Sequence, residues 1–123
     1  MTRFLSCLTA VGLASLPVSA APVLTKTSGT CPGPMTYQAT GTTPGTLSKL
    51  LFALNTGSYV IPNGPCAGTV LGLGQAGLTV VQTSPNNNGI AVFSGVAGPN
   101  ACGKFLQAVD GGTCLTSNVV VVF

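Results

Sequence analysis

Turn-forming residues interrupt this chain at short, regular intervals, and that spacing limits the folds open to it. The clusters GTTPG (41–45), PNGPC (62–66), PNNNG (85–89) and DGG (110–112) separate short apolar runs. Gly, Pro, Asn and Asp accept turn geometry at little cost, each for its own stereochemical reason. The runs begin about every 8 to 12 residues, a spacing typical of an all-β sandwich or barrel.

Nine of these runs are predicted to be strands. In one of them Met35, Tyr37 and Ala39 alternate with polar residues, as they would in a strand with one buried face. The predicted strands are Val23–Thr27, Met35–Thr40, Leu47–Leu54, Ser58–Ile61, Thr69–Leu71, Leu78–Thr83, Ile90–Val96, Phe105–Val109 and Asn118–Phe123.

Two of the predicted strands are apolar on both faces. Periodicity alone allows Leu47–Leu54 to be helix or strand, and we interpret it as a strand with one face in the core and a loop over the other. The C-terminal run SNVVVVF (117–123) would pair with other chains at an exposed edge. It is therefore predicted to lie inside the sheet or under a cover.

Residues 1–20 are predicted to be a secretory signal peptide. A cation at Arg3 precedes an apolar run from Phe4 to Leu16, and small residues at 18–20 fit the cleavage position. The run is too short for a transmembrane helix, which needs about 20 apolar residues. Cleavage would leave residues 21–123 as one secreted domain in the periplasm, on the cell surface or outside the cell.

Four cysteines remain after that cleavage, at Cys31, Cys66, Cys102 and Cys114. An even number in an exported chain indicates two disulfides. A zinc site is disfavoured because the cysteines form no close Cys-x-x-Cys pair and the chain has no histidine. Four cysteines allow three pairings. The short spacing around an Asp-Gly turn favours Cys102–Cys114, which leaves Cys31–Cys66 as the second bond.

Very little ionisable chemistry is available to this chain. Charged residues are 4% of the sequence, histidine is absent and Asp110 is the only acid. Acid–base pairs, glycosidase pairs and triads need a second titrating group, and calcium sites need several carboxylates. Lys26, Lys49 and Lys104 form no basic patch for nucleic acid, and no motif marks a Ser–Lys dyad. We predict no enzyme activity, metal, cofactor or nucleic-acid partner.

Asp110 and Gly111 are predicted to form a turn, because Asp-Gly is a strong hairpin signal whose two positions both accept a positive φ. Tyr37 and Tyr59 could stack on a sugar, but tyrosines of a sandwich more often belong to its core or rim. The PNNNG loop could bind a ligand, but a solvated turn is the more common interpretation.

Three stretches of the chain, TYQATGTTPGTLSKLLFAL, GSYVIPNGPCAGTVLGLG and LQAVDGGTCLTSNVVVVF, are similar to small exported modules of bacterial surface and secreted proteins. The resemblance spans about Cys31 to Val122. It implies an antiparallel, immunoglobulin-like β-sandwich of about seven to nine short strands with disulfides. It implies no particular activity.

Together these observations favour an exported, non-enzymatic β-sandwich that acts as a structural or binding module on an unknown surface or extracellular ligand. The alternative is a self-assembling, fimbrial-type subunit that adds its C-terminal strand to a neighbour, because low charge removes the repulsion that keeps proteins monomeric. A small-molecule carrier would need a sizeable apolar cavity. An inhibitor is disfavoured by the low charge and the long cysteine spacings.

Overall fold

The computed structural model describes residues 20–74 and 79–123. Residues 1–19 of the predicted signal peptide lie outside the described residues. Leu78, the first residue of one predicted strand, also lies outside them. Seven β-strands and one short 3-10 turn, Pro99–Ala101, form the regular structure of the described part, in which no α-helix occurs. The all-β prediction is confirmed.

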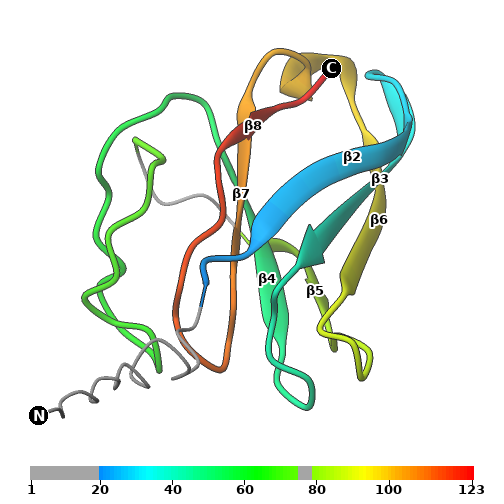
Figure 1. Ribbon diagram of the computed structural model, residues 1–123. Coiled ribbons are helices and arrows are strands. Elements are labelled where there is room, and N and C mark those ends of the chain that lie inside the picture. The colour runs from blue at the N-terminus through cyan, green and yellow to red at the C-terminus, as the bar shows by residue number, and fades with distance from the viewer. Residues whose placement is uncertain (1–19, 75–78) are drawn as a thin grey trace, which may run out of the picture.

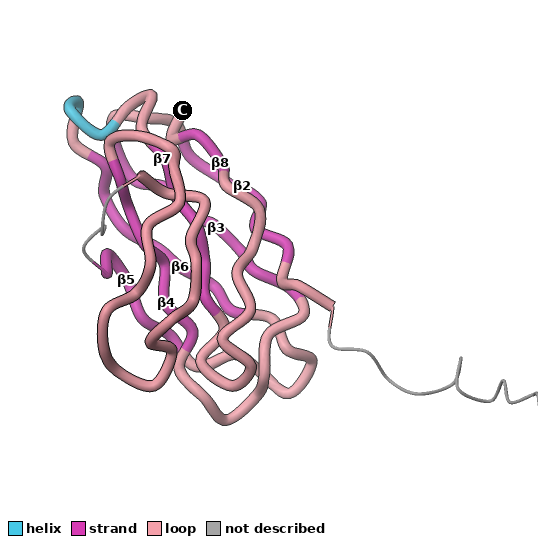
Figure 2. The backbone as a smooth tube through the Cα atoms, turned by 90° about the vertical axis from the view of Figure 1, so that its left-hand side faces the viewer, coloured by secondary structure: helices cyan, strands magenta, loops and turns pink. Residues whose placement is uncertain are grey.

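The strands form two antiparallel sheets. In chain order they are β2 (Val23–Gly29), β3 (Gly33–Thr40), β4 (Ser48–Ala53), β5 (Thr79–Thr83), β6 (Ala91–Ala97), β7 (Phe105–Val109) and β8 (Val120–Val121). One sheet has the order β2–β3–β6 and the other the order β5–β4–β7–β8. The two sheets lie against each other (Figure 1), and Figure 2 shows them in a view turned by a quarter rotation.

The main core lies between the two sheets. The alternation noted in β3 places Met35, Tyr37 and Ala39 on its inner face, all under a tenth exposed. They pack with inward side chains of both sheets: Leu24, Leu50, Ala91, Phe93, Leu106, Ala108 and Val122. Removing this apolar surface from water is the principal force that holds the sheets together.

The outer face of the four-stranded sheet is covered by a covering segment, residues 54–74, which follows β4. Figure 1 shows it in green, on the side of this sheet that faces away from β2, β3 and β6. Its residues Leu71 and Leu73 pack on Leu51, Ala53 and Val109 in a second buried cluster. The prediction that the run at residues 47–54 is a strand with one core face and one loop-covered face is confirmed.

Two predicted strands, Ser58–Ile61 and Thr69–Leu71, are instead the two arms of the covering segment. They share isolated bridges and a few backbone hydrogen bonds, such as that from the Tyr59 N–H to the Leu73 carbonyl at 2.9 Å. Pro62 follows the first arm and has no amide hydrogen to donate. The arms are therefore too short for a ladder, and they pack on the face of the sheet rather than extending its edge.

The C-terminal run is a strand only at β8, which is shorter than predicted. β8 pairs with β7, and the next residue, Val122, lies in the main core. The side chain of Asn118 binds the backbone of β2: Oδ1 accepts the Leu24 N–H at 2.8 Å, and Nδ2 donates to the Leu24 carbonyl at 3.0 Å. This end of the chain therefore lies within its own fold and closes the edge between β8 and β2.

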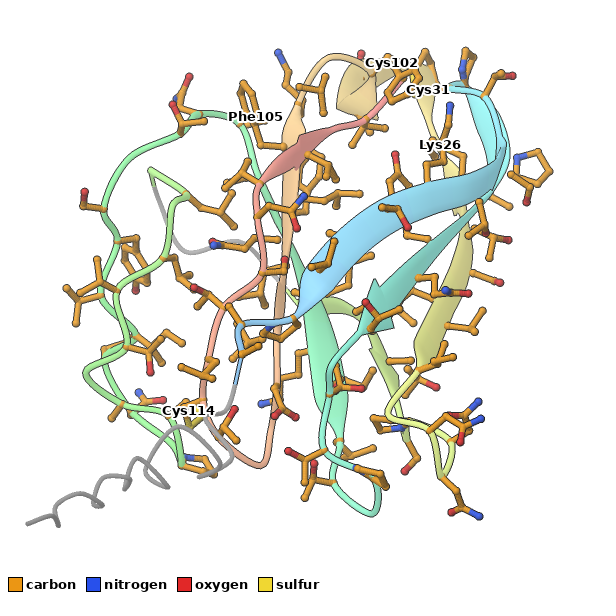
Figure 3. All side chains as sticks on the ribbon, in the orientation of Figure 1. Lys26, Cys31, Cys102, Phe105 and Cys114 are labelled. Atoms are coloured by element: carbon orange, nitrogen blue, oxygen red, sulfur yellow. A yellow bond between two sulfur atoms is a disulfide. The ribbon has the colours of Figure 1, made fainter. Side chains whose placement is uncertain are left out.

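The four cysteines form two disulfides, as predicted, but the predicted pairing is wrong. Cys31 is bonded to Cys102, and Cys66 to Cys114. A Cys102–Cys114 bond is disfavoured because β7 lies between these residues and its five residues alone span about 17 Å, whereas a disulfide needs Cα atoms within about 7 Å. Cys31 and Cys102 meet because the start of β3 pairs with the end of β6. The two bonds lie at opposite ends of the sandwich (Figure 3).

Replacing either bonded cysteine pair by serines is expected to lower the free energy of unfolding by about 4 kcal/mol. This is the chain-entropy value for loops of the size that the bonds close, whose ends are 71 and 48 residues apart. Denaturant unfolding of the two double variants beside the wild type measures the loss. A loss below about 1 kcal/mol for either pair would contradict the assigned role.

Peptide mapping without reductant is expected to recover Cys66 linked to Cys114. Trypsin alone leaves Cys66 and Cys102 on one peptide, because no Lys or Arg occurs between residues 50 and 103. A second cleavage after Phe93 separates them. Recovery of Cys102 linked to Cys114 would contradict the pairing described above.

Candidate functional site

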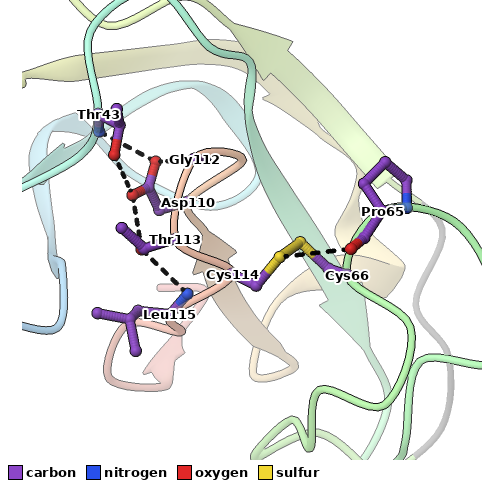
Figure 4. Close-up of a disulfide and its surroundings, with 8 residues drawn as sticks. All are labelled: Thr43, Pro65, Cys66, Asp110, Gly112, Thr113, Cys114 and Leu115. Atoms are coloured by element: carbon purple, nitrogen blue, oxygen red, sulfur yellow. Dashed lines mark hydrogen bonds between the residues drawn. A yellow bond between two sulfur atoms is a disulfide. The ribbon is translucent and has the colours of Figure 1, made fainter.

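Asp110 is fully buried after β7, and its carboxylate accepts hydrogen bonds from three residues (Figure 4). Oδ1 accepts the N–H of Thr43 at 3.0 Å and that of Gly112 at 3.2 Å. Oδ2 accepts the hydroxyls of Thr43 at 2.7 Å and Thr113 at 2.8 Å. Burial alone would raise the pKa of this carboxyl, but the hydrogen bonds from Thr43, Thr113 and Gly112 outweigh it and hold the pKa below its ordinary value.

The chain turns after Asp110 over residues 111–113, although not in the expected geometry. The Asp110 carbonyl accepts the Cys114 N–H at 2.8 Å, and the positive φ falls on Cys114 (60°) rather than on Gly111. Gly111 meets a different requirement, since a Cβ there would collide with the backbone carbonyl of Leu47. Asp110 thus acts as a structural tie between the β3–β4 loop and this turn.

Two other candidates from the sequence, Tyr37 and the PNNNG loop, have structural roles. Tyr37 is in the main core, where burial raises the pKa of its hydroxyl and the nearby backbone of Phe123 partly offsets the rise. The PNNNG turn is held by its own first asparagine, since Asn86 Oδ1 accepts the N–H groups of Asn88 at 2.9 Å and Ile90 at 3.1 Å. Neither is placed as a binding residue.

The lysines differ in what surrounds them. Lys26 Nζ donates to the Phe123 carbonyl at 2.9 Å and lies 3.5 Å from the centroid of its ring, so this ammonium is engaged by the C-terminal residue. Ser48 and Lys49 are neighbours in β4 but lie on opposite faces, with Ser48 fully buried and Lys49 exposed. These two residues therefore form no Ser–Lys dyad.

Gln107 holds the covering segment in place, although the sequence did not single it out. It is buried on the outer face of β7, where Oε1 accepts the Gly72 N–H at 2.8 Å and Nε2 donates to the Ser117 carbonyl at 2.7 Å. It thereby joins the covering segment to the stretch before β8. Its only signal in the sequence is a single amide within the apolar strand FLQAV.

A groove of about 530 Å³ lies between the covering segment and the outer face of the four-stranded sheet. The Cys66–Cys114 bond fixes its wall to the turn after β7. Tyr59, which the sequence offered as a candidate binding residue, lies in this groove beside residues that nothing in the sequence groups with it. Its lining is Leu47, Lys49, Leu51, Tyr59, Ile61, Pro62, Asn63, Gly64, Pro65, Cys66, Leu71, Gln82, Val109 and Gly111.

The charge of the groove comes from Lys49, which is paired in register with Gln82 of β5. Both side chains are exposed. No carboxylate lines the groove, because the only acid of the chain, Asp110, is buried and hydrogen-bonded elsewhere. An ammonium beside an amide, above an apolar floor, can bind a ligand but offers no second titrating group for proton transfer.

A smaller cavity of about 250 Å³ lies between the two sheets, where β6 and β5 are the edge strands. Inward positions of β6 include Phe93 and Gly95, and a Cβ at Gly95 would meet nothing within 4 Å. The missing side chain at Gly95 leaves this space open. The Tyr37 hydroxyl, on a residue of the same lining, is buried without a hydrogen-bond partner among the described residues.

Comparisons with protein-family models, with curated proteins and with solved structures each gave no match to this chain. Across residues 20–74 and 79–123, no helix is long and apolar enough to cross a membrane. In the same residues no three His, Cys, Asp or Glu side chains gather as a metal site.

Asp110→Ala is expected to lower the free energy of unfolding by about 3 kcal/mol, because it leaves the hydrogen-bond donors of Thr43, Gly112 and Thr113 without their acceptor. Asp110→Asn keeps one carbonyl oxygen and should cost less. Because the folded pKa is lowered, the carboxylate's stabilisation is complete above its ordinary pKa of about 3.9. It is lost as the pH falls through the folded value.

Denaturant unfolding from about pH 7 to about pH 2 measures this dependence. Asp110 carries the only acidic side chain, so the Asp110→Asn variant should lose most of the wild type's sensitivity to acid in this range. Equal acid sensitivity in the two proteins would contradict the assigned role of the carboxylate.

Proposed function

We propose that this protein is an exported, non-enzymatic β-sandwich of the immunoglobulin-like type that binds an extracellular or cell-surface ligand in the groove beside the covering segment. The groove itself carries the proposal. Its volume of about 530 Å³ falls in the range of small-ligand sites, about 300–1,000 Å³. Its lining combines apolar side chains with a few polar ones, as such sites do.

The groove is held by several independent ties, which supports binding. The Cys66–Cys114 bond fixes one part of the covering segment, and the hydrogen bond from Gly72 to Gln107 fixes another. Apolar contacts around Leu73 hold a third. A preformed wall reduces the ordering cost that a ligand would otherwise have to offset.

The disulfides and the buried carboxylate, rather than the groove, support export and a non-enzymatic role. Two disulfides fit a protein that matures in an oxidising compartment, as does the predicted signal peptide. The one carboxylate, Asp110, is fully buried and hydrogen-bonded, so it is not available to a substrate. These observations favour a binding module over an enzyme.

A self-assembling subunit is the second candidate. It is favoured by β6, an edge strand on which Val92 and Val96 are 50% and 79% exposed, because such edges can pair with another chain. Assembly through the C-terminal strand is less favoured, since β8 is hydrogen-bonded to β7 and Val122 is 3% exposed in the core.

Deleting Val119–Phe123 is expected to unfold the protein, because it removes β8 and the core side chain of Val122. Circular dichroism and a denaturant transition would show whether cooperative folding is lost. A truncated protein that stays folded but no longer assembles would instead favour the assembly function.

The binding function is tested first by fractionating cells and sizing the native protein, where we expect a monomer outside the cytoplasm. Amide NMR shifts recorded against candidate ligands should then change around Lys49 and Tyr59. Tyr59→Ala should weaken binding about tenfold, since a lost aromatic contact is worth about 1.4 kcal/mol. Val96→Ser, on the other sheet, is the control and should have no effect. A large assembly, or ligands that shift only residues outside the groove, would contradict the proposal.

A further inference from the structure

We infer that the groove beside the covering segment binds an amphiphilic organic anion, a molecule with one carboxylate-like group and an apolar chain or ring. This inference rests on the proposed binding function and adds the class of ligand. It follows from three features of the groove: a cation without a counter-ion, an amide donor beside it, and an apolar surface around both.

Lys49 is a cation that the chain itself does not neutralise. The sequence contains one acidic side chain, Asp110, and its carboxylate is fully buried and bonded to Thr43 and Thr113. Lys26, in contrast, is engaged by the C-terminal residue. An anionic ligand would therefore meet Lys49 without displacing an existing ion pair.

Gln82 places an amide next to this ammonium. The two residues are opposite each other in the β4–β5 register, and opposite residues of an antiparallel pair have Cβ atoms about 5 Å apart. Both side chains line the groove. Together the ammonium and the amide N–H can donate to the two oxygens of one carboxylate.

The rest of the groove suits an apolar body. Leu51, Leu71 and Val109 form buried parts of its lining, and the partly exposed ring of Tyr59 stands in the wall. Transfer of each methylene group from water to such a surface contributes about 0.8 kcal/mol. Apolar burial would therefore supply most of the affinity, while Lys49 selects for the sign of the charge.

Other ligand classes match these features less well. An organic cation would meet Lys49 and no carboxylate in the groove. A neutral apolar molecule would leave Lys49 to be desolvated without compensation, and it would fit the cavity beside Gly95 better. That second cavity supplies a control, because a leucine at Gly95 fills it and leaves the groove unchanged.

Isothermal calorimetry of the full disulfide-bonded protein with octanoate, octan-1-ol and octyltrimethylammonium tests the inference. Octanoate is expected to bind about fivefold more tightly than octan-1-ol, the difference that an ion pair worth about 1 kcal/mol produces. Octyltrimethylammonium should bind most weakly. Added salt should weaken octanoate binding but leave octan-1-ol binding unchanged.

Three variants locate the interaction. Lys49→Gln should abolish the preference for octanoate over octan-1-ol. Lys104→Gln makes the same change of charge at a residue that does not line the groove and should keep the preference. Gly95→Leu, which fills the other cavity, should also keep it. Unchanged denaturant transitions would show that all three variants remain folded.

The outcomes separate this inference from the proposed function. If octan-1-ol binds as well as octanoate, Lys49→Gln has no effect and Gly95→Leu still binds both probes, the anion inference is wrong while groove binding stands. If octanoate binding is lost in Gly95→Leu, the ligand occupies the other cavity and the inference is wrong. If no probe binds, and no ligand of any class shifts the groove residues, the inference and the proposed function both fail.

Discussion

One buried residue, Asp110, links the β3–β4 loop to the turn after β7, and a disulfide links that turn to the covering segment. The side chain of Asp110 accepts hydrogen bonds from Thr43 of the β3–β4 loop, and the backbone carbonyl of Asp110 accepts the N–H of Cys114. Cys114 is bonded to Cys66 of the covering segment. The position of the outer wall of the groove therefore depends on the turn that Asp110 organises.

The carboxylate is stabilised there by dipoles rather than by a cation. Taking an ionised carboxyl out of water costs several kcal/mol, and each hydrogen bond to a charged acceptor contributes about 1.5–3 kcal/mol in return. The bonds from Thr43, Gly112 and Thr113 outweigh the burial, in agreement with the lowered pKa of Asp110. Among the described residues, neutral groups donate all of the hydrogen bonds to the Asp110 carboxylate, so it forms no ion pair with a lysine. Lys49 therefore faces the groove without an acidic partner.

The two long edges of the sandwich differ. Side-chain bonds close one edge, and the smaller cavity lies at the other. At one edge Asn118 joins the stretch before β8 to β2, and Lys26 binds Phe123. At the other edge β5 and β6 belong to different sheets, and the space beside Gly95 lies between those sheets. That space is the smaller of the two and is lined mainly by apolar residues, whereas the groove on the outer face is larger and carries the charge. This difference supports the proposal that a charged ligand binds in the groove.

Local sequence signals determined much of the fold. Turn clusters and the alternation of Met35, Tyr37 and Ala39 located most of the strands, because turn geometry and pleat are local properties of the chain. The even cysteine count indicated two disulfides, and the single acid indicated a turn with no catalytic partner. Tertiary structure alone decided which cysteines meet, since β7 carries Cys102 and Cys114 to opposite ends.

The groove likewise could not be read from the sequence. The pairing of Lys49 with Gln82 depends on the order of strands in the sheet. The burial of Gln107 depends on the covering segment packing on a face instead of extending an edge. What the sequence by itself determined were strands, turns and available chemistry. The disulfide partners and the groove were decided only by the tertiary structure, because they join residues far apart in the chain.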